Sequence, residues 1–136
     1  MTDTPPRPTD AELAILRVLW SRGPSTVRDV HENLARVHET GYTTTLKLLQ
    51  IMAQKGLVTR DESRRSHVYT TTVTEDETQR QIVGDVLERA FGGSARQLVM
   101  QALSTKRASP EELAEIRALL DELDGGGGDE RGAADV

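Results

Sequence analysis

Three consecutive threonines, Thr43, Thr44 and Thr45, stand before an apolar segment with helical spacing, and Lys47 follows one turn on. A threonine hydroxyl can hydrogen-bond to a base or a phosphate, and its methyl group can pack on a thymine methyl. A helix N-terminus also favours phosphate through its free backbone N–H groups. A threonine block can equally cap a helix through its hydroxyls, so the pattern alone leaves nucleic-acid contact and capping both open.

Four further side chains could contact the sugar–phosphate backbone of DNA. Tyr42 directly precedes the threonines and carries a hydroxyl that can bond to phosphate. Arg64 and Arg65 end a charged stretch, "DESRR", and His67 follows two residues later. We therefore expect a DNA-binding set composed of Tyr42, Thr43, Thr44, Thr45, Lys47, Arg64, Arg65 and His67.

The elements that would position these side chains can be located from capping and periodicity. Capping boxes, in which a Ser or Thr and a Glu or Gln three residues later satisfy each other's backbone N–H groups, mark helix starts at Thr9/Glu12, Thr74/Glu77, Ser94/Gln97 and Ser109/Glu112. Apolar spacing predicts helices over residues 10–21, 26–37 and 43–55. β-Branched residues on both sides of "DESRR" predict strands at 57–61 and 66–72, joined by a loose loop.

Three helices followed by a strand, a turn and a strand are the order of a winged helix, a helix-turn-helix variant. The third helix of a helix-turn-helix fold enters the major groove and contacts base edges with its N-terminal residues. The threonine block lies at that end of the third predicted helix. The sequence thus predicts a mainly α-helical protein with a small β-hairpin, in which residues 1–73 are a winged-helix DNA-binding domain.

The second half of the chain predicts three more helices, over residues 75–91, 95–104 and 110–123. Their apolar residues recur at helical spacing, among them Val86, Leu98, Leu113, Ile116, Leu120 and Leu123. A unit of about 50 residues buries a low fraction of its surface, and a second copy would supply the missing burial. We expect residues 74–123 to be a helical dimerisation domain, with folding back on the first domain as the alternative. The Gly-rich tail, residues 124–136, is expected to be disordered.

Charge is unevenly distributed along the chain. Residues 1–72 hold ten Lys/Arg and eight Asp/Glu, whereas residues 73–136 hold seven and fourteen, within a total net charge of −5. A domain that binds a polyanion, joined in the same chain to an acidic domain, would show this asymmetry. Acidic helices that are merely solvated would show it as well.

Composition excludes several classes of protein. Cysteine is absent, which removes disulfides, thiolate catalysis and cysteine metal sites together. No apolar run approaches the roughly 20 residues of a membrane span. The N-terminus has no basic region followed by an apolar stretch, as a secretory signal would. We expect a soluble cytoplasmic protein that uses no cofactor and no metal.

An enzymatic interpretation has one candidate segment, "HENLARVH". The zinc-protease motif H-E-x-x-H needs its second histidine at i+4, but that position is Ala35, and His38 lies at i+7 from His31. Both are interpreted as surface histidines. The three scattered histidines support no Ser-His-Asp set, so we expect no catalytic site.

Four segments carry a resemblance to a known family: "TDAELAILRVLW", "YTTTLKLLQIMAQKGLV", "RRSHVY" and "SPEELAEIRALLDEL". Their order and spacing, over about residues 8–123, resemble the penicillinase repressors, dimeric winged-helix proteins that include the β-lactamase and methicillin-resistance repressors. The resemblance implies a C-terminal dimerisation domain and repression through a palindromic operator with TACA and TGTA elements. It also implies that Thr44 and Lys47 lie on the helix face that meets the groove.

The resemblance further implies a membrane sensor protease as partner, because in the best-known members such a protease triggers cutting of an Asn–Phe bond. The matching stretch here, "LVMQALS", has the pair Gln101–Ala102 instead. The chain therefore departs from the family at the cleavage bond, which leaves the protease and the β-lactam signal open. Relatives that respond to copper use C-terminal cysteines, and this chain has none.

Two other functions stay open from the sequence. A winged helix can serve as a protein-interaction adaptor, which the acidic balance slightly favours. Salt separates the two cases, because DNA affinity held by phosphates falls steeply with salt and apolar protein contacts do not. A small-molecule-responsive regulator is the other alternative, although the helical half is small and poor in aromatic residues.

Overall fold

The computed structural model of the chain describes residues 6–34 and 40–135, with side chains as far as residue 125. It contains two compact units, residues 1–86 and 87–136. Helix α4 (Glu75–Phe91) continues across the division between them. The domain limits that the sequence places at residues 73 and 123 therefore stay predictions.

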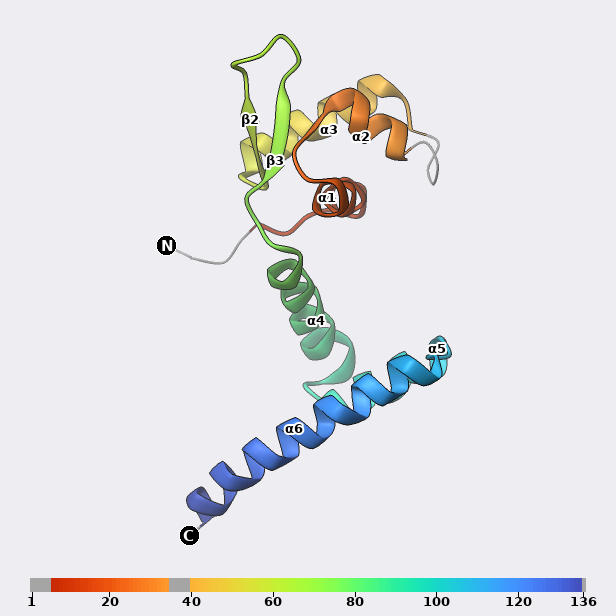
Figure 1. Cartoon of the computed structure of the whole chain (residues 1–136), viewed down its shortest axis with the longest axis vertical. Coiled ribbons are helices and arrows are strands. Elements are labelled where there is room, and N and C mark those ends of the chain that lie inside the picture. Colours follow the sequence, from red (N-terminus) through yellow and green to blue (C-terminus); the bar gives the residue numbers. More distant parts are fainter. Residues whose placement is uncertain (1–5, 35–39, 136) are drawn as a thin grey trace. The chain divides into compact units, whose positions relative to one another are not determined.

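The first unit has the element order that the sequence predicts for a winged helix (Figure 1). Helices α1 (Asp10–Arg22), α2 (Val27–Leu34) and α3 (Tyr42–Lys55) precede the strands β2 (Val58–Asp61) and β3 (Val68–Thr71). The mainly helical fold class is confirmed. Helix α3 ends where predicted, because Gly56 adopts the left-handed conformation with φ 87°. The predicted end of the second helix, residues 35–37, lies outside the described residues.

The sheet has one strand more than the predicted hairpin. Strand β1 (Ser25–Thr26) pairs antiparallel with β3, and β2 pairs antiparallel with the other side of β3. Two residues are too few to show the alternation by which a strand is recognised in a sequence, which is why β1 was missed. We call the hairpin of β2, β3 and their connecting loop, residues 58–71, the wing.

Side-chain caps hold the helix starts that the sequence predicts. Reciprocal capping hydrogen bonds are present at Thr9/Glu12, Thr74/Glu77 and Ser109/Glu112. At α5 (Ala95–Thr105), the Ser94 hydroxyl accepts from the Gln97 backbone N–H. One more box joins Thr26 and Asp29 at the start of α2. It was missed because Asp replaces the usual Glu or Gln.

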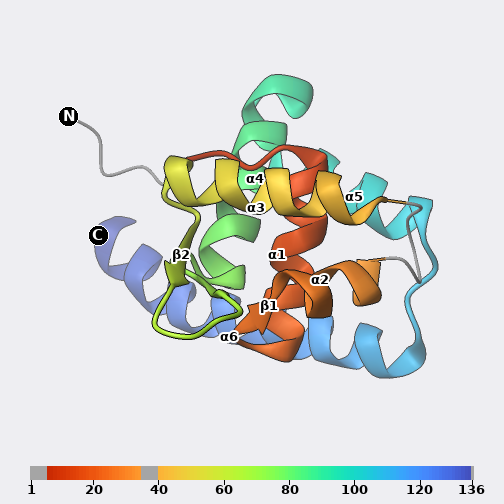
Figure 2. The same cartoon turned by 90° about the horizontal axis from the view of Figure 1, so that it is seen from above.

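The core of the first unit lies where α1, α2 and α3 meet one another and the sheet (Figure 2). Leu16 of α1, Val30 of α2 and Leu49 of α3 are fully buried, and Tyr69 of β3 joins them from the sheet. The Trp20 indole N–H donates to the Val73 carbonyl at 3.0 Å, which ties α1 to the segment after β3. These contacts hold α3 and the wing on one framework.

The second unit contains the end of α4, helix α5 and helix α6 (Pro110–Asp135). None of the residues from 79 to 125 is buried within the single chain. Large apolar side chains of α4, α5 and α6 are instead exposed: Val83, Val86, Val99, Met100, Leu103, Leu119, Leu120 and Leu123. Among the described helices, none is both long enough and apolar enough to cross a membrane.

Helix α6 extends past the predicted end at residue 123 and includes the segment for which the sequence predicts disorder. Each glycine there costs roughly 1 kcal/mol relative to alanine, which is the basis of the expected disorder. Elongation of a formed helix, however, costs far less than nucleation of a new one. The capped start at Ser109/Glu112 therefore allows the helix to continue to Asp135.

A buried carboxylate joins the start of α1 to the end of α3. Glu12 is only 2% exposed, and Lys55 Nζ lies 2.6 Å from Glu12 Oε1. Burial alone would raise the pKa of Glu12. The hydrogen bonds from Lys55 and Thr9, with the positive charge of Lys55, outweigh burial and hold the pKa of Glu12 below its usual value. Glu12 therefore stays ionised at neutral pH, and its contact with Lys55 anchors the C-terminal end of α3.

We expect Glu12→Gln to lower the free energy of unfolding at pH 7 by about 1–3 kcal/mol, because it removes a charged partner from a buried contact. The folded-state pKa of Glu12 is depressed, so the stabilisation is present above the unfolded-state value of about 4.3. It is lost as pH falls through the lower folded-state pKa. Urea unfolding of both proteins at pH 7 and at steps toward pH 3 measures the gap, which should close in acid.

Glu112→Gln is the matched control, since Glu112 makes the same capping contact on an exposed helix start. Its effect should stay within a few tenths of a kcal/mol at pH 7. A gap between Glu12→Gln and the parent protein that keeps its size from pH 7 to pH 3 would show that the charge of Glu12 contributes nothing.

Candidate nucleic-acid interface

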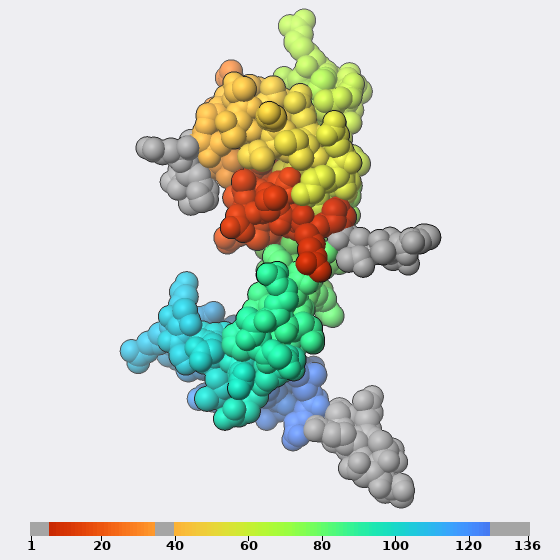
Figure 3. Space-filling model, turned by 180° about the vertical axis from the view of Figure 1, so that it is seen from behind, coloured from red at the N-terminus to blue at the C-terminus, as the bar shows by residue number. Residues whose placement is uncertain are grey.

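Helix α3 has one buried side and one exposed side. Thr45, Leu49 and Met52, spaced by four and three residues, are fully buried. The opposite side carries only polar groups that are exposed: Thr43, Lys47, Gln50 and Gln54. At about 100° per residue these four lie within an arc of roughly 60°. The packing of the core thus presents a single polar stripe, and the surface of α3 is uncovered in Figure 3.

Thr45 does not belong to this exposed side. It is fully buried, and its hydroxyl donates to the Gly41 carbonyl at 3.2 Å. The sequence-based expectation that Thr45 contacts DNA is therefore corrected. The physical reason is its register with Leu49 and Met52, which turns the threonine toward the core.

Thr43 and Thr44 are exposed at the first turn of α3. The residue before the helix is Gly41, and no side-chain hydrogen bond caps this helix start. In the described structure, the hydroxyls of Thr43 and Thr44 therefore do not cap the helix, which was the alternative explanation for the threonine block. They are free to bond with a ligand at the end of the helix where unpaired backbone N–H groups also point outward.

A concavity of about 640 Å³ lies between the first turn of α2, helix α3 and the wing. We call it the basic concavity, because three arginines and a histidine contribute to its wall and no Asp or Glu among the described residues does. Its lining consists of Thr26, Val27, Arg28, Tyr42, Leu46, Gln50, Arg60, Arg65, Ser66, His67 and Tyr69. Of the residues predicted from the sequence, Tyr42, Arg65 and His67 are brought together here.

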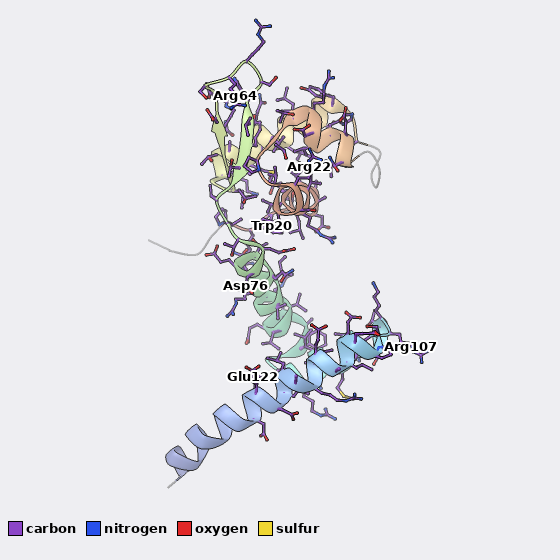
Figure 4. All side chains as sticks on the ribbon, viewed as in Figure 1. Trp20, Arg22, Arg64, Asp76, Arg107 and Glu122 are labelled. Atoms are coloured by element: carbon purple, nitrogen blue, oxygen red, sulfur yellow. The ribbon has the colours of Figure 1, made fainter. Side chains whose placement is uncertain are left out.

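The remaining predicted residues lie elsewhere on the first unit. Lys47 belongs to the polar stripe of α3, and Arg64 lies on the exposed loop of the wing (Figure 4). The wing loop also carries two carboxylates. The Ser63 backbone N–H holds the pKa of Asp61 below its usual value, and Glu62 Oε2 accepts from Arg60 Nε at 2.8 Å. Local hydrogen bonds thus engage both acids.

Sequence reasoning missed two arginines of the basic concavity. Arg28 lies in the first turn of α2, directly after the Thr26/Asp29 capping box. Arg60 lies on β2, where it was interpreted only as part of a strand. The Thr26/Asp29 box could have located Arg28 at a helix start. No comparable signal exists for Arg60, because the pairing of β2 with β3 decides where it lies.

Tyr42 is held beside the basic concavity by a ring contact. The centroids of the Tyr42 and His31 rings are 5.8 Å apart in an edge-to-face arrangement, with 78° between their planes. His31, the first histidine of the segment that superficially resembles a zinc motif, thus packs against the start of α3. The second histidine, His38, lies outside the described residues.

A model of the penicillinase repressor family matches residues 8–122, which is most of the chain. The chain belongs to the penicillinase repressor family. As a member, it is a DNA-binding transcriptional repressor and not an enzyme. The polar stripe and the basic concavity are the surfaces of this repressor that suit a polyanion, since they combine free hydroxyl, amide and cationic groups.

Two related proteins match this penicillinase repressor along nearly all of its length. Transcriptional regulator BlaI of Mycobacterium tuberculosis is 35% identical over 120 residues, covering 88% of this chain and 86% of the relative. The penicillinase repressor of Bacillus licheniformis is 25% identical over 117 residues, covering 86% and 91%. A solution structure of monomeric B. licheniformis BlaI in complex with the blaP half-operator has a TM-score of 0.48 and 25% identity, covering 54% of this chain and 89% of that one.

We expect Arg28→Ala to weaken DNA binding by this repressor at every sequence tested, because a guanidinium in the basic concavity neutralises phosphate without reading bases. Loss of one phosphate contact should also reduce the slope of log affinity against log salt by about 1. Fluorescence anisotropy over a salt series measures both quantities.

Arg17→Ala is the matched control. Arg17 is an exposed arginine of α1 in the same unit, but it does not line the basic concavity. It should leave both affinity and slope unchanged. Equal losses in the two variants would mean that total charge, and not the place of Arg28, governs binding.

Proposed function

We propose that two copies of this repressor bind a palindromic DNA operator, with one α3 in the major groove of each half-site. The observation that carries the proposal is the polar stripe of α3 next to the basic concavity. Side chains that can contact base edges lie along the stripe, and cationic side chains line the groove between α3 and the wing. A DNA strand beside an inserted α3 would place its phosphates against those cations.

Exposed apolar side chains of the second unit support the two-fold arrangement. Leu120 and Leu123 are 58% and 60% exposed in the single chain, and Val86 is 38% exposed. The other predicted pairing residues, Leu98, Leu113 and Ile116, are half-buried. Apolar faces of this extent mark an interaction site, and we assign them to a second copy of the chain.

A two-fold dimer predicts a palindromic operator whose half-sites are about one helical turn of DNA apart, roughly 34 Å. The family resemblance suggests TACA and TGTA elements within those half-sites. Occupation of such a site would block a promoter. Loosening of the pairing would lower operator affinity, because each monomer alone makes half of the contacts. This role places the protein with the DNA, in the cytoplasm.

Release of repression is a further part of the proposal, and it concerns helix α5. The Gln101–Ala102 bond, which stands where the best-known relatives are cut, lies within α5. The Thr105 hydroxyl donates to the Gln101 carbonyl at 2.7 Å. A membrane sensor protease that acted on this bond would have to unwind that turn of α5 first. Separation of the paired helices would expose the turn and connect cleavage to loss of the dimer.

The proposal is tested by fluorescence anisotropy of the purified protein with two duplexes, one carrying a TACA/TGTA palindrome and one a scrambled sequence. We expect tight binding to the palindrome alone, weakening steeply between low and moderate salt. Binding that is weak and equal for both duplexes would contradict the proposed operator. Salt-independent capture of a protein with no DNA binding would favour the adaptor function.

We expect Leu120→Asp to separate the dimer, because a carboxylate would replace an apolar contact between the two copies. The dissociation constant of the dimer should rise by roughly 100-fold or more. Sedimentation equilibrium at micromolar concentration measures the mass of both proteins. Operator affinity should fall in the same variant.

Glu122→Ala is the control for this substitution, since Glu122 lies on the side of α6 opposite Leu120 (Figure 4). It should leave the mass at that of a dimer. A monomeric parent protein at micromolar concentration would overturn the assignment of the apolar faces to a second copy.

A further inference from the structure

Gln50 occupies a distinctive place at the middle of α3. It is exposed, and it lines both the basic concavity and a second hollow of about 460 Å³ that opens toward β2. Arg60 of the wing lines the same two hollows. Gln50 therefore borders both hollows between α3 and the wing, and a DNA strand lying there would pass beside it.

The groups around Gln50 differ from it in chemistry, and two of them already contact other side chains. The Arg60 guanidinium is held by Glu62 at 2.8 Å, and the Tyr42 ring packs against His31. The other cationic side chains of the concavity suit phosphate, which carries no sequence information. Gln50 alone in this lining offers a neutral side-chain amide, and it has no hydrogen-bond partner among the described residues.

The position of Gln50 along α3 determines which base-pair step its side chain would reach. Thr43, Lys47 and Gln50 follow one another on the polar stripe, with rises of about 6 Å and 4.5 Å at 1.5 Å per residue. Base pairs in B-DNA are about 3.4 Å apart, so the roughly 10.5 Å from Thr43 to Gln50 spans about three base-pair steps of one half-site. The Gln50 amide would then face the base step beyond the one nearest Lys47.

We propose that Gln50 is a specificity-determining residue that reads an adenine in each half-site of the operator. A glutamine amide donates to adenine N7 and accepts from adenine N6 in the major groove, a pairing that the other bases do not offer. Lys47 and the threonines would supply contacts that several bases accept. The inference rests on the proposed function, since it needs α3 in the major groove.

The test is a selection of duplexes from a random-sequence library by the full-length protein, compared with Gln50→Ala and Gln54→Ala. We expect the parent protein to enrich a palindrome that contains one A·T pair whose preference disappears in Gln50→Ala. The discrimination lost should be about 10-fold or more per half-site. Gln54→Ala is the matched control for position, because Gln54 carries the same amide on the same stripe, one turn on, but lines only the second hollow, so any base it contacts lies at another step. It should keep the preference.

Two further experiments test which atoms of Gln50 and of the base form the contact. Gln50→Glu should exchange the preferred adenine for cytosine at the same position, because a carboxylate accepts from cytosine N4. Replacing the adenine with 7-deazaadenine, which lacks the N7 acceptor, should weaken binding by the parent protein several-fold and leave Gln50→Ala unaffected. The second comparison stays decisive even if Gln50→Ala binds all duplexes more weakly.

The outcomes separate this inference from the proposed function. Enrichment of no sequence by the parent protein would overturn both. Enrichment of a palindrome that Gln50→Ala selects with undiminished discrimination would overturn the role of Gln50 and leave the repressor function intact. An equal loss of preference in Gln54→Ala would also overturn it, since the assignment depends on the place of Gln50 beside the wing.

Discussion

The burial of one side of α3 is the constraint on which the other features of the first unit depend. Leu49 and Met52 reach the core, and Thr45 accompanies them although it is polar, because its hydroxyl bonds to the Gly41 carbonyl. A rotation of α3 by one residue, about 100°, would withdraw these side chains from the core and bury part of the polar stripe. Each unpaired polar group buried in that way costs roughly 1–3 kcal/mol. Packing therefore selects which residues of α3 are exposed to a ligand.

The arrangement of the first unit also explains how a protein with a negative net charge presents a basic surface. The net charge of −5 describes the whole chain, whereas a bound phosphate responds to charges within about 10 Å at ordinary salt. The wall of the basic concavity holds Arg28, Arg60 and Arg65 and, among the described residues, no Asp or Glu. Lys55, although it is on α3, is held at 2.6 Å by Glu12 and stabilises the fold instead. Local arrangement, and not net charge, makes this unit suited to a polyanion.

Periodicity and capping could predict the fold closely, since helix starts are marked by residues a few positions apart. Prediction from sequence failed where the structure depends on contacts between residues far apart in the sequence. Strand β1 exists because β3 pairs with Ser25 and Thr26, and Arg60 reaches the basic concavity because β2 pairs with β3. Thr45 was placed among the DNA contacts because three adjacent threonines look alike in a sequence, whereas their directions on a helix differ by about 100° each. The apolar stripes of the second unit were predicted, and their large apolar side chains are exposed in the single chain.

The central claim is that two copies of the exposed face of α3 contact one palindrome. Hydroxyl-radical footprinting of the full-length protein on a palindromic operator tests it directly. We predict two protected patches related by two-fold symmetry, with centres about 10 base pairs apart on one face of the duplex. A single protected patch, or even protection along the whole duplex, would contradict the account.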